Sequence, residues 1–256
     1  MNSLKGTLKR EDFGFLMPIT DHIHMAPPLY LREFESFSIA FEMDYGSVKD
    51  MLPEPLEFAG PVPHGVVGIH NFEKANIGAF HEVGLLFNVM YKGEEYLYIS
   101  NFFVDSDVPL CGGRENYGNA KKIADIKFYH DRNMLVCTVD RPKGVRFMTA
   151  TIMIEDPMPI ENFKNMKTLN LKKIPNTEGK GDDVCQLVMQ NNPQIPVISS
   201  DGFANIWTGV GSLQWDFQSN VDPWYKAKIT KITGATYGIF TQTATLGTVV
   251  HDYLEE

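Results

Sequence analysis

Hydrophobic and polar side chains alternate with a period of two in the most regular part of the chain, residues 36–43. One face of this segment carries Phe37, Ile39, Phe41 and Met43, and the other carries Ser36, Ser38, Ala40 and Glu42. Successive side chains of a strand point to opposite faces of its sheet. The pattern therefore predicts a β-strand with one buried face.

Further apolar runs, with turn residues between them, predict a chain rich in strands. Residues 85–91 and 96–104 flank the turn-like tetrad Lys92-Gly93-Glu94-Glu95, and residues 134–139 and 145–154 flank a second turn at 140–144. Both pairs are expected to form hairpins. The later strand-like runs are residues 184–189, 212–217, 226–233 and 237–243.

Helices are expected to be few and short. Residues 45–52 form one candidate, which ends before Pro53 because a proline disfavours helical backbone in the preceding residue. Residues 119–126 form another. No repeat or linker divides the chain, and Gly and Pro are spread along it as tight turns require. We predict a single domain over residues 1–256, mainly β (α+β), with its strands in a closed barrel or a sandwich.

Composition and charge narrow the classes of function. The 256 residues include 17 Phe, enough for a sizeable core, and carry a formal net charge of −9. A chain this acidic lacks the basic surface that binds nucleic acid, and it is not attracted to an anionic membrane. We therefore expect neither nucleic acid nor a membrane as a partner. A small anionic substrate would need a local positive pocket.

Several absences point to a cytoplasmic protein. The cysteines Cys111, Cys137 and Cys185 are odd in number and widely spaced, which predicts no disulfide framework. The first residues lack the apolar stretch of a signal peptide. No apolar run approaches the ~18 residues of a membrane helix.

Three short motifs have ordinary structural explanations. Asp105-Ser106-Asp107 is typical of a solvated turn. His22-Ile23-His24 lacks a third ligand at zinc spacing, and we predict no metal site. Gly209-Val210-Gly211 lacks the third glycine and the strand–helix context of a dinucleotide loop.

Two adjacent lysine pairs, Lys121-Lys122 and Lys172-Lys173, carry more chemical interest. A neighbouring ammonium disfavours protonation of its partner, and burial adds to this effect. A neutral amine is a nucleophile toward ketones. The alternative for either pair is a solvated surface position, since unpaired lysines are rarely buried. The residues alone do not choose between the two pairs.

The segment from Gly113-Arg114-Glu115 to Lys121-Lys122 resembles the active-site stretch of the acetoacetate decarboxylase family. Further matches follow in the family's order and cover nearly the whole chain. They are Arg32-Glu33, Leu52-Pro53-Glu54-Pro55-Leu56-Glu57, Glu82-x-Gly84, Thr149-Ala150-Thr151, Ile174-Pro175-Asn176, Trp207-Thr208-Gly209 with Leu213-Gln214, and Asp252-Tyr253-Leu254.

The resemblance implies a fold and a set of site residues. The fold is a closed, mainly antiparallel β-barrel with short flanking helices, assembled as a homo-oligomer. Lys121 forms a Schiff base with a small oxo acid, and Lys122 is the neighbouring cation that favours its neutral amine. Arg32 binds the substrate carboxylate, and Glu82 holds Arg32 or moves a proton. No cofactor is implied, because the lysine supplies the electron sink. Lys172-Lys173 stays a surface pair, and neither Tyr117 nor Tyr253 is assigned a role.

One departure from the family's pattern leaves the reaction open. The family decarboxylase carries a second active-site glutamate before the Glu-x-Gly, and an ungapped count places Val67 there. His70 and Glu73 lie nearby, but only a shifted alignment recruits either. Relatives keep the lysine yet perform aldol addition and dehydration on pyruvate and aldehydes. The expected function is thus a Schiff-base-forming lyase of small oxo acids, with an aldolase-dehydratase or a non-catalytic ligand-binding barrel as alternatives.

Overall fold

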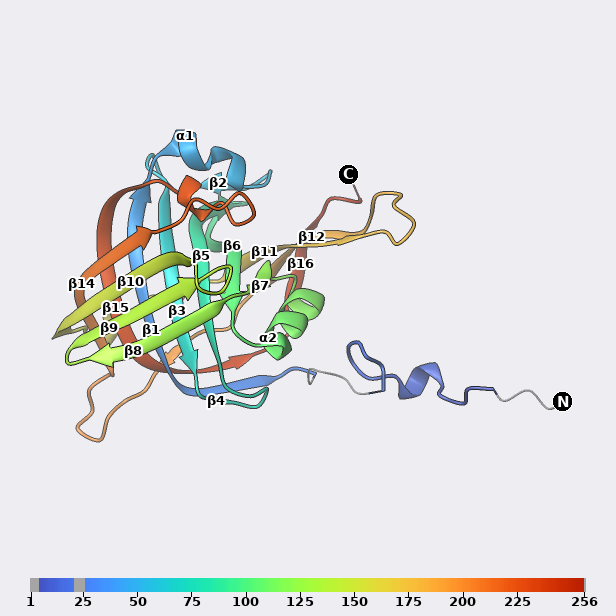
Figure 1. Ribbon diagram of the computed structural model, residues 1–256, viewed down its shortest axis with the longest axis horizontal. Helices are drawn as coiled ribbons and strands as arrows, with labels where there is room; N and C mark the ends of the chain where they lie inside the picture. Colours follow the sequence, from blue (N-terminus) through green and yellow to red (C-terminus); the bar gives the residue numbers. More distant parts are fainter. Residues whose placement is uncertain (1–4, 21–25, 256) are drawn as a thin grey trace.

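The computed structural model describes residues 5–20 and 26–255. One strongly curved sheet makes up most of the molecule, and residues 5–20 lie away from it (Figure 1). The described strands are β1 (Leu29–Met43), β2 (Glu57–Phe58), β3 (His64–Phe72), β4 (Lys74–Ala75), β5 (Phe80–Tyr91), β6 (Glu94–Val104), β7 (Lys121–Ile123), β8 (Asp125–Asp131), β9 (Met134–Asp140), β10 (Arg146–Pro157), β11 (Thr168–Pro175), β12 (Asp182–Gln190), β13 (Ile195–Pro196), β14 (Ile206–Trp215), β15 (Ile229–Ala244) and β16 (Thr248–Asp252).

Helical structure is limited to short segments. They are α1 (Tyr45–Val48), α2 (Asp107–Gly112), the π-helical turn η3 (Gly113–Tyr117) and the 3-10 turns η1 (Arg10–Asp12), η2 (Lys49–Met51), η4 (Ile160–Asn162) and η5 (Trp224–Lys226). Within residues 5–20 and 26–255, no helix has the length and apolar character needed to cross a membrane. The three cysteines are free, as predicted.

The sheet is mixed and open. Its strands are hydrogen-bonded in the order β16-β12-β11-β6-β5-β3-β1-β15-β14-β10-β9-β8, with β2, β4, β7 and β13 attached beside this path. The prediction of a mainly β fold with few short helices is confirmed. The predicted closed barrel is wrong, because among the described residues β8 pairs only with β9 and β16 only with β12.

The crowded edge of β6 accounts for the missing closure. One edge of this strand pairs with β5. The other is shared by two parallel neighbours, β7 beside residues 102–104 and β11 beside residues 97–98. A strand has only two edges, so β8 has no place to pair with β6. The sheet therefore folds back on itself without joining its ends.

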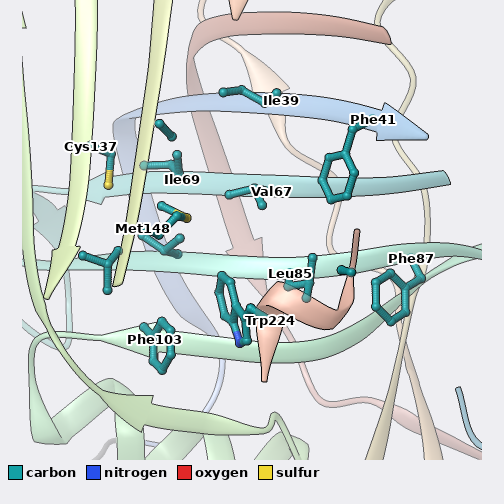
Figure 2. Close-up of a cluster of buried hydrophobic side chains, with 14 of the residues drawn as sticks. Ile39, Phe41, Val67, Ile69, Leu85, Phe87, Phe103, Cys137, Met148 and Trp224 are labelled. Atoms are coloured by element: carbon teal, nitrogen blue, oxygen red, sulfur yellow. The ribbon is translucent and has the colours of Figure 1, made fainter. Parts of the chain in front are cut away.

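The sheet has two faces, which we call the core face and the cavity face. On the core face, side chains of β1, β3, β5 and β6 pack against those of β9 and β10; Figure 2 shows Ile39, Val67, Leu85 and Phe103 pointing into one cluster with Cys137 and Met148. On the cavity face, the alternate residues of β1, Ser36 and Ser38, border an open space. The alternation predicted for residues 36–43 is confirmed.

Most predicted elements are present, with one error. The hairpin of β5 and β6 turns at Lys92 and Gly93, both with positive φ. The predicted strands 226–233 and 237–243 form one strand, β15. The predicted helix at 119–126 is wrong: helical backbone lies upstream and ends at Gly118, whose φ of +78° suits a glycine. The chain then extends along the edge of β6 as β7.

Candidate active site

Lys121 begins β7, at the point where the chain returns to the sheet after α2 and η3. Its side chain is 9% exposed, on the cavity face. Nζ lies 2.6 Å from Oε2 of Glu82 on β5, a carboxylate that is itself 11% exposed. The rings of Phe102 and Phe80 lie 5.7 and 6.0 Å from Nζ. A buried amine thus has one charged partner and aromatic neighbours.

The glycine and arginine of the Gly-Arg-Glu sequence have separate steric and hydrogen-bonding roles. A Cβ added to Gly113 would lie 2.5 Å from Cδ of Lys121, so a side chain at this position would displace the lysine. Arg114 donates from Nη1 to the backbone carbonyl of Lys121 at 3.2 Å. The helical turn therefore both makes room for the lysine and holds its backbone, which explains the spacing between the two parts of the motif.

The Glu-x-Gly sequence of β5 has a similar steric explanation. A Cβ added to Gly84 would lie 2.1 Å from the ring of Phe102, the aromatic residue beside the lysine amine. Glu82 and Gly84 are two residues apart and therefore share the cavity face. The glycine lets the ring pack flat against the strand whose carboxylate contacts Lys121.

His70 is the third ionisable group of the site. It lies directly opposite Glu82 in the antiparallel pairing of β3 with β5, and it lines the same cavity. Its Nδ1 is buried without a hydrogen-bond partner among the described residues. Burial lowers the pKa of His70, the Glu82 charge opposes this, and the Lys121 charge adds to it. The imidazole is therefore kept neutral near neutral pH and can accept a proton.

These groups face a cavity of about 310 Å³. Its polar lining includes Ser36, Tyr117 and Asn119, and burial raises the pKa of the Tyr117 phenol to about 12. Much of the remaining wall is apolar. Glu82 is the only carboxylate that lines the cavity in the part of the chain the structure describes, and no arginine lines it there.

Lys122 points away from this cavity. Adjacent strand residues face opposite sides of a sheet, and the Lys122 ammonium lies on the core face, 2.7 Å from Oδ1 of buried Asp222 and 2.9 Å from the carbonyl of Val221. Arg141 binds the other oxygen of Asp222 at 2.7 Å. Lys122 was expected to act as a cation beside the amine of Lys121, but its ammonium lies on the opposite face of β7. There Lys122 anchors β7 to Asp222.

Arg32 also lies outside the cavity. It sits at a bulge of β1 where Glu33 has a φ of +48° and the register against β15 shifts. The bulge turns Leu31 toward the cavity, while the Arg32 guanidinium donates to the carbonyl of Gln242 at 2.9 Å. The expected contacts of Arg32 with a substrate carboxylate and with Glu82 are therefore absent from this arrangement.

The sequence model of the acetoacetate decarboxylase (ADC) family matches residues 16–254. The chain belongs to the acetoacetate decarboxylase family. It is 28% identical over 245 residues to the acetoacetate decarboxylase of Acidiphilium cryptum, covering 94% of this chain and 96% of that one.

Solved structures share the fold. The acetoacetate decarboxylase of Legionella pneumophila superposes with a TM-score of 0.83 at 27% identity, covering 98% of this chain and 99% of the other. The enduracididine biosynthesis enzyme MppR, complexed with the condensation product of pyruvate and imidazole 4-carboxaldehyde, superposes with a TM-score of 0.76 at 16% identity, covering 97% and 100%. The latter likeness concerns the fold alone.

The position of Val67 corrects the comparison with the family's second glutamate. Val67 is fully buried on the core face, so no residue there can reach the cavity. The residues of β3 that line the cavity are Val66, Gly68 and His70. Glu73, the other nearby candidate, is exposed beyond the end of β3. An ungapped count chose the wrong face of the strand, whereas the period of two could have pointed to His70.

The remaining lysine pair is structural. The Lys172 ammonium donates to the carbonyl of Asn116 at 3.2 Å, and burial lowers the pKa of this lysine. A Cβ added to Gly118 would lie 2.7 Å from Cα of Lys172, so the lysine pair packs against the end of η3. Lys173 forms an ion pair with Asp182. Lys172-Lys173 therefore supports the segment that carries the site without entering it.

The other candidate residues lie outside the cavity or outside the described part of the chain. Asp105 accepts the backbone N–H of His81 at 2.8 Å and contacts its ring at 2.6 Å, as a turn carboxylate does. Gly209 and Gly211 lie within β14 rather than in a phosphate loop. The hydroxyl of Tyr253 donates to the carbonyl of Glu54. His22 and His24 lie outside the described residues.

Proposed function

We propose that this chain is a Schiff-base-forming lyase that acts on small oxo acids through Lys121. The observation that carries the proposal is the buried ion pair of Lys121 with Glu82, 2.6 Å apart and open to a cavity. An isolated buried ion pair adds little stability compared with apolar residues, so its position beside an open cavity favours a chemical role.

Glu82 prepares the amine for the first step. A proton passes from the Lys121 ammonium to the carboxylate across their short contact. The neutral amine then adds to the ketone carbon of the oxo acid, and loss of water leaves an iminium. The aromatic rings beside Nζ lower the local polarity, which strengthens the electrostatic interactions there.

The iminium can then accept an electron pair by either of two routes. From a 3-oxo acid, the bond to the carboxylate breaks and carbon dioxide leaves, which gives an enamine. From pyruvate, loss of a methyl proton gives an enamine that can attack an aldehyde. Glu82, protonated in the first step, can return its proton to the enamine carbon, and neutral His70 can remove the methyl proton, since both line the cavity. Hydrolysis returns the free lysine.

The aldolase-dehydratase alternative has one specific observation in its favour. Among the described residues Glu82 is the sole carboxylate in the cavity lining, and His70 occupies the neighbouring cavity-facing position of β3. A second carboxylate would repel the substrate carboxylate and help to expel carbon dioxide. A neutral imidazole cannot repel the substrate carboxylate, but it can take a methyl proton from pyruvate. In a non-catalytic binding protein the Lys121 ammonium would hold an anionic ligand without forming a covalent adduct.

Borohydride reduction tests the proposal. Acetoacetate or pyruvate with borohydride should add mass at Lys121, and Lys122→Gln should be labelled at the same residue. The absence of labelling with both acids would leave the ligand-binding alternative. Acetone release from acetoacetate, compared with product from pyruvate plus an aldehyde, then separates the two reactions. The single domain, homo-oligomeric assembly and cytoplasmic location stay predictions.

A further inference from the structure

We propose that the substrate of this site is an oxo acid with an apolar substituent of about four to eight carbon atoms, larger than acetoacetate or pyruvate. The proposal rests on the function proposed for Lys121 and names its substrate class. Three features of the cavity carry it: its volume, its separate apolar wall, and a bulge that sets which side chains form that wall.

The volume exceeds the needs of a very small acid. A cavity of about 310 Å³ is at the lower end of the roughly 300–1,000 Å³ of pockets that bury drug-sized ligands. Acetoacetate has only seven non-hydrogen atoms. Space left beside such a substrate would hold water next to the iminium, where water hydrolyses the intermediate.

The wall beside Lys121 is a separate apolar cluster. Leu86, Ile99 and Phe102 form a group of buried residues distinct from the main core, with Leu97 packed against it. All four line the cavity. Because the main core lies on the other face of the sheet, an occupant of the cavity can supply further apolar contact to these side chains. An apolar substituent would remove their remaining surface from water.

A bulge in β6 makes this wall continuous. Leu85 pairs with Asn101 and Leu86 with Ile99, so Ser100 is the extra residue. Without the bulge, Leu97 and Ile99 would share their face with Asn101. With it, Phe102 takes that place beside the lysine amine. Bulges near active sites re-aim side chains in this way, and here the result is an unbroken apolar surface.

The lining offers little to hold a charged substituent instead. Besides Lys121, the only cation that lines the cavity in the described part of the chain is Lys164. The acid function of the substrate can bind Lys164 or the neutral amide and hydroxyl groups of the lining, and the other end of the molecule faces leucine, isoleucine and phenylalanine. This distribution favours a substrate with one charged end and one apolar end.

A chain-length series of 3-oxo acids tests the proposal on the full protein. Borohydride trapping at Lys121 is measured against the concentration of acetoacetate, 3-oxooctanoate and 3-oxodecanoate, whose ketone substituents have one, five and seven carbon atoms. We expect the half-saturating concentration to fall about fourfold for each added methylene until the cavity is filled. Equal trapping across the series would overturn the substrate class and leave the lysine chemistry intact. No labelling with any acid would overturn both proposals.

Two substitutions at one position provide a paired test. Leu97→Phe fills part of the cavity and should shift the preference tenfold or more toward acetoacetate. Leu97→Ala enlarges the cavity and should shift the preference in the opposite direction, toward the longest acid. Opposite shifts distinguish a change of volume from a general loss of stability. The matched control is Val210→Phe, at an exposed site of β14, and an altered chain-length preference there would contradict the proposal.

Discussion

The two faces of β7 place adjacent lysines in different surroundings. Lys121 on the cavity face and Lys122 on the core face each contact a carboxylate, at 2.6 and 2.7 Å. Lys122 also binds a backbone carbonyl, and its partner Asp222 is shared with Arg141. Lys121 has Glu82, two aromatic rings and a cavity. The same side chain therefore stabilises the fold on one face and is available for chemistry on the other.

Removal of the two amines gives the largest contrast. Lys121→Ala should lose all borohydride-dependent labelling by oxo acids, because Lys121 is the one lysine of the cavity lining that pairs with Glu82 among the described residues. Lys122→Ala should keep the label and lose stability instead. Mass spectrometry of the trapped protein and chemical denaturation measure the two effects. Persistent labelling of Lys121→Ala at another residue would reverse the assignment.

The apolar cluster around Val67 on the core face should not tolerate an unpaired charge. Val67→Glu buries a carboxylate among apolar side chains, and we expect it to destabilise the fold by about 3 kcal/mol or more. It should bring no gain in acetone release from acetoacetate, since the new side chain cannot reach the cavity. A stable variant with increased decarboxylation would show that position 67 faces the site after all.

The anchor of Lys122 gives a smaller loss of stability. Asp222→Ala removes a carboxylate that is 3% exposed and leaves Lys122 and Arg141 without it. Both cations are partly exposed and can turn to water. We therefore expect the free energy of unfolding to fall by about 2–3 kcal/mol, at or below the usual loss for breaking a buried pair. Urea denaturation measures this. Glu82→Gln is the counterpart on the cavity face, where trapping should fall far more than stability.

The steric role of Gly113 can be separated from general effects of alanine. Gly113→Ala places a methyl group 2.5 Å from Cδ of Lys121. A displaced amine should react about 100-fold more slowly. Gly234→Ala is the matched control, since nothing lies within 4 Å of its added Cβ. Equal trapping rates for the two variants would remove the steric explanation of the motif.

The smallest expected effect concerns pH. Burial lowers the pKa of His70 in the folded state, so below about pH 6.5 the unfolded state binds more protons. The free energy of unfolding should therefore fall as the pH drops from 7.5 to 5.5, by at most about 1.4 kcal/mol per unit from this group. His70→Asn should reduce that slope. An unchanged slope in the variant would assign the pH dependence to other groups.

Local pattern was enough to predict most strands, and the resemblance to the family selected Lys121 as the candidate nucleophile. The alternation at residues 36–43 and the two hairpins depend on neighbours in sequence, and the structure contains them. The helix expected at 119–126 was wrong because that segment pairs with a strand edge some twenty residues earlier. Arg32 and Val67 were misassigned because a single bulge, or a count that is off by one, turns a side chain to the opposite face.

The sequence by itself determined the β-rich texture, the family and the choice of Lys121, since these follow from periodicity and from motifs whose residues are close along the chain. Only the tertiary structure decided what surrounds that lysine. Glu82 and His70 meet it across β5, β6 and β3, and Asp222, 100 residues along the chain, binds Lys122 on the other face. The physical reason is that strand pairing and bulges set the direction of each side chain, and both depend on contacts between distant segments.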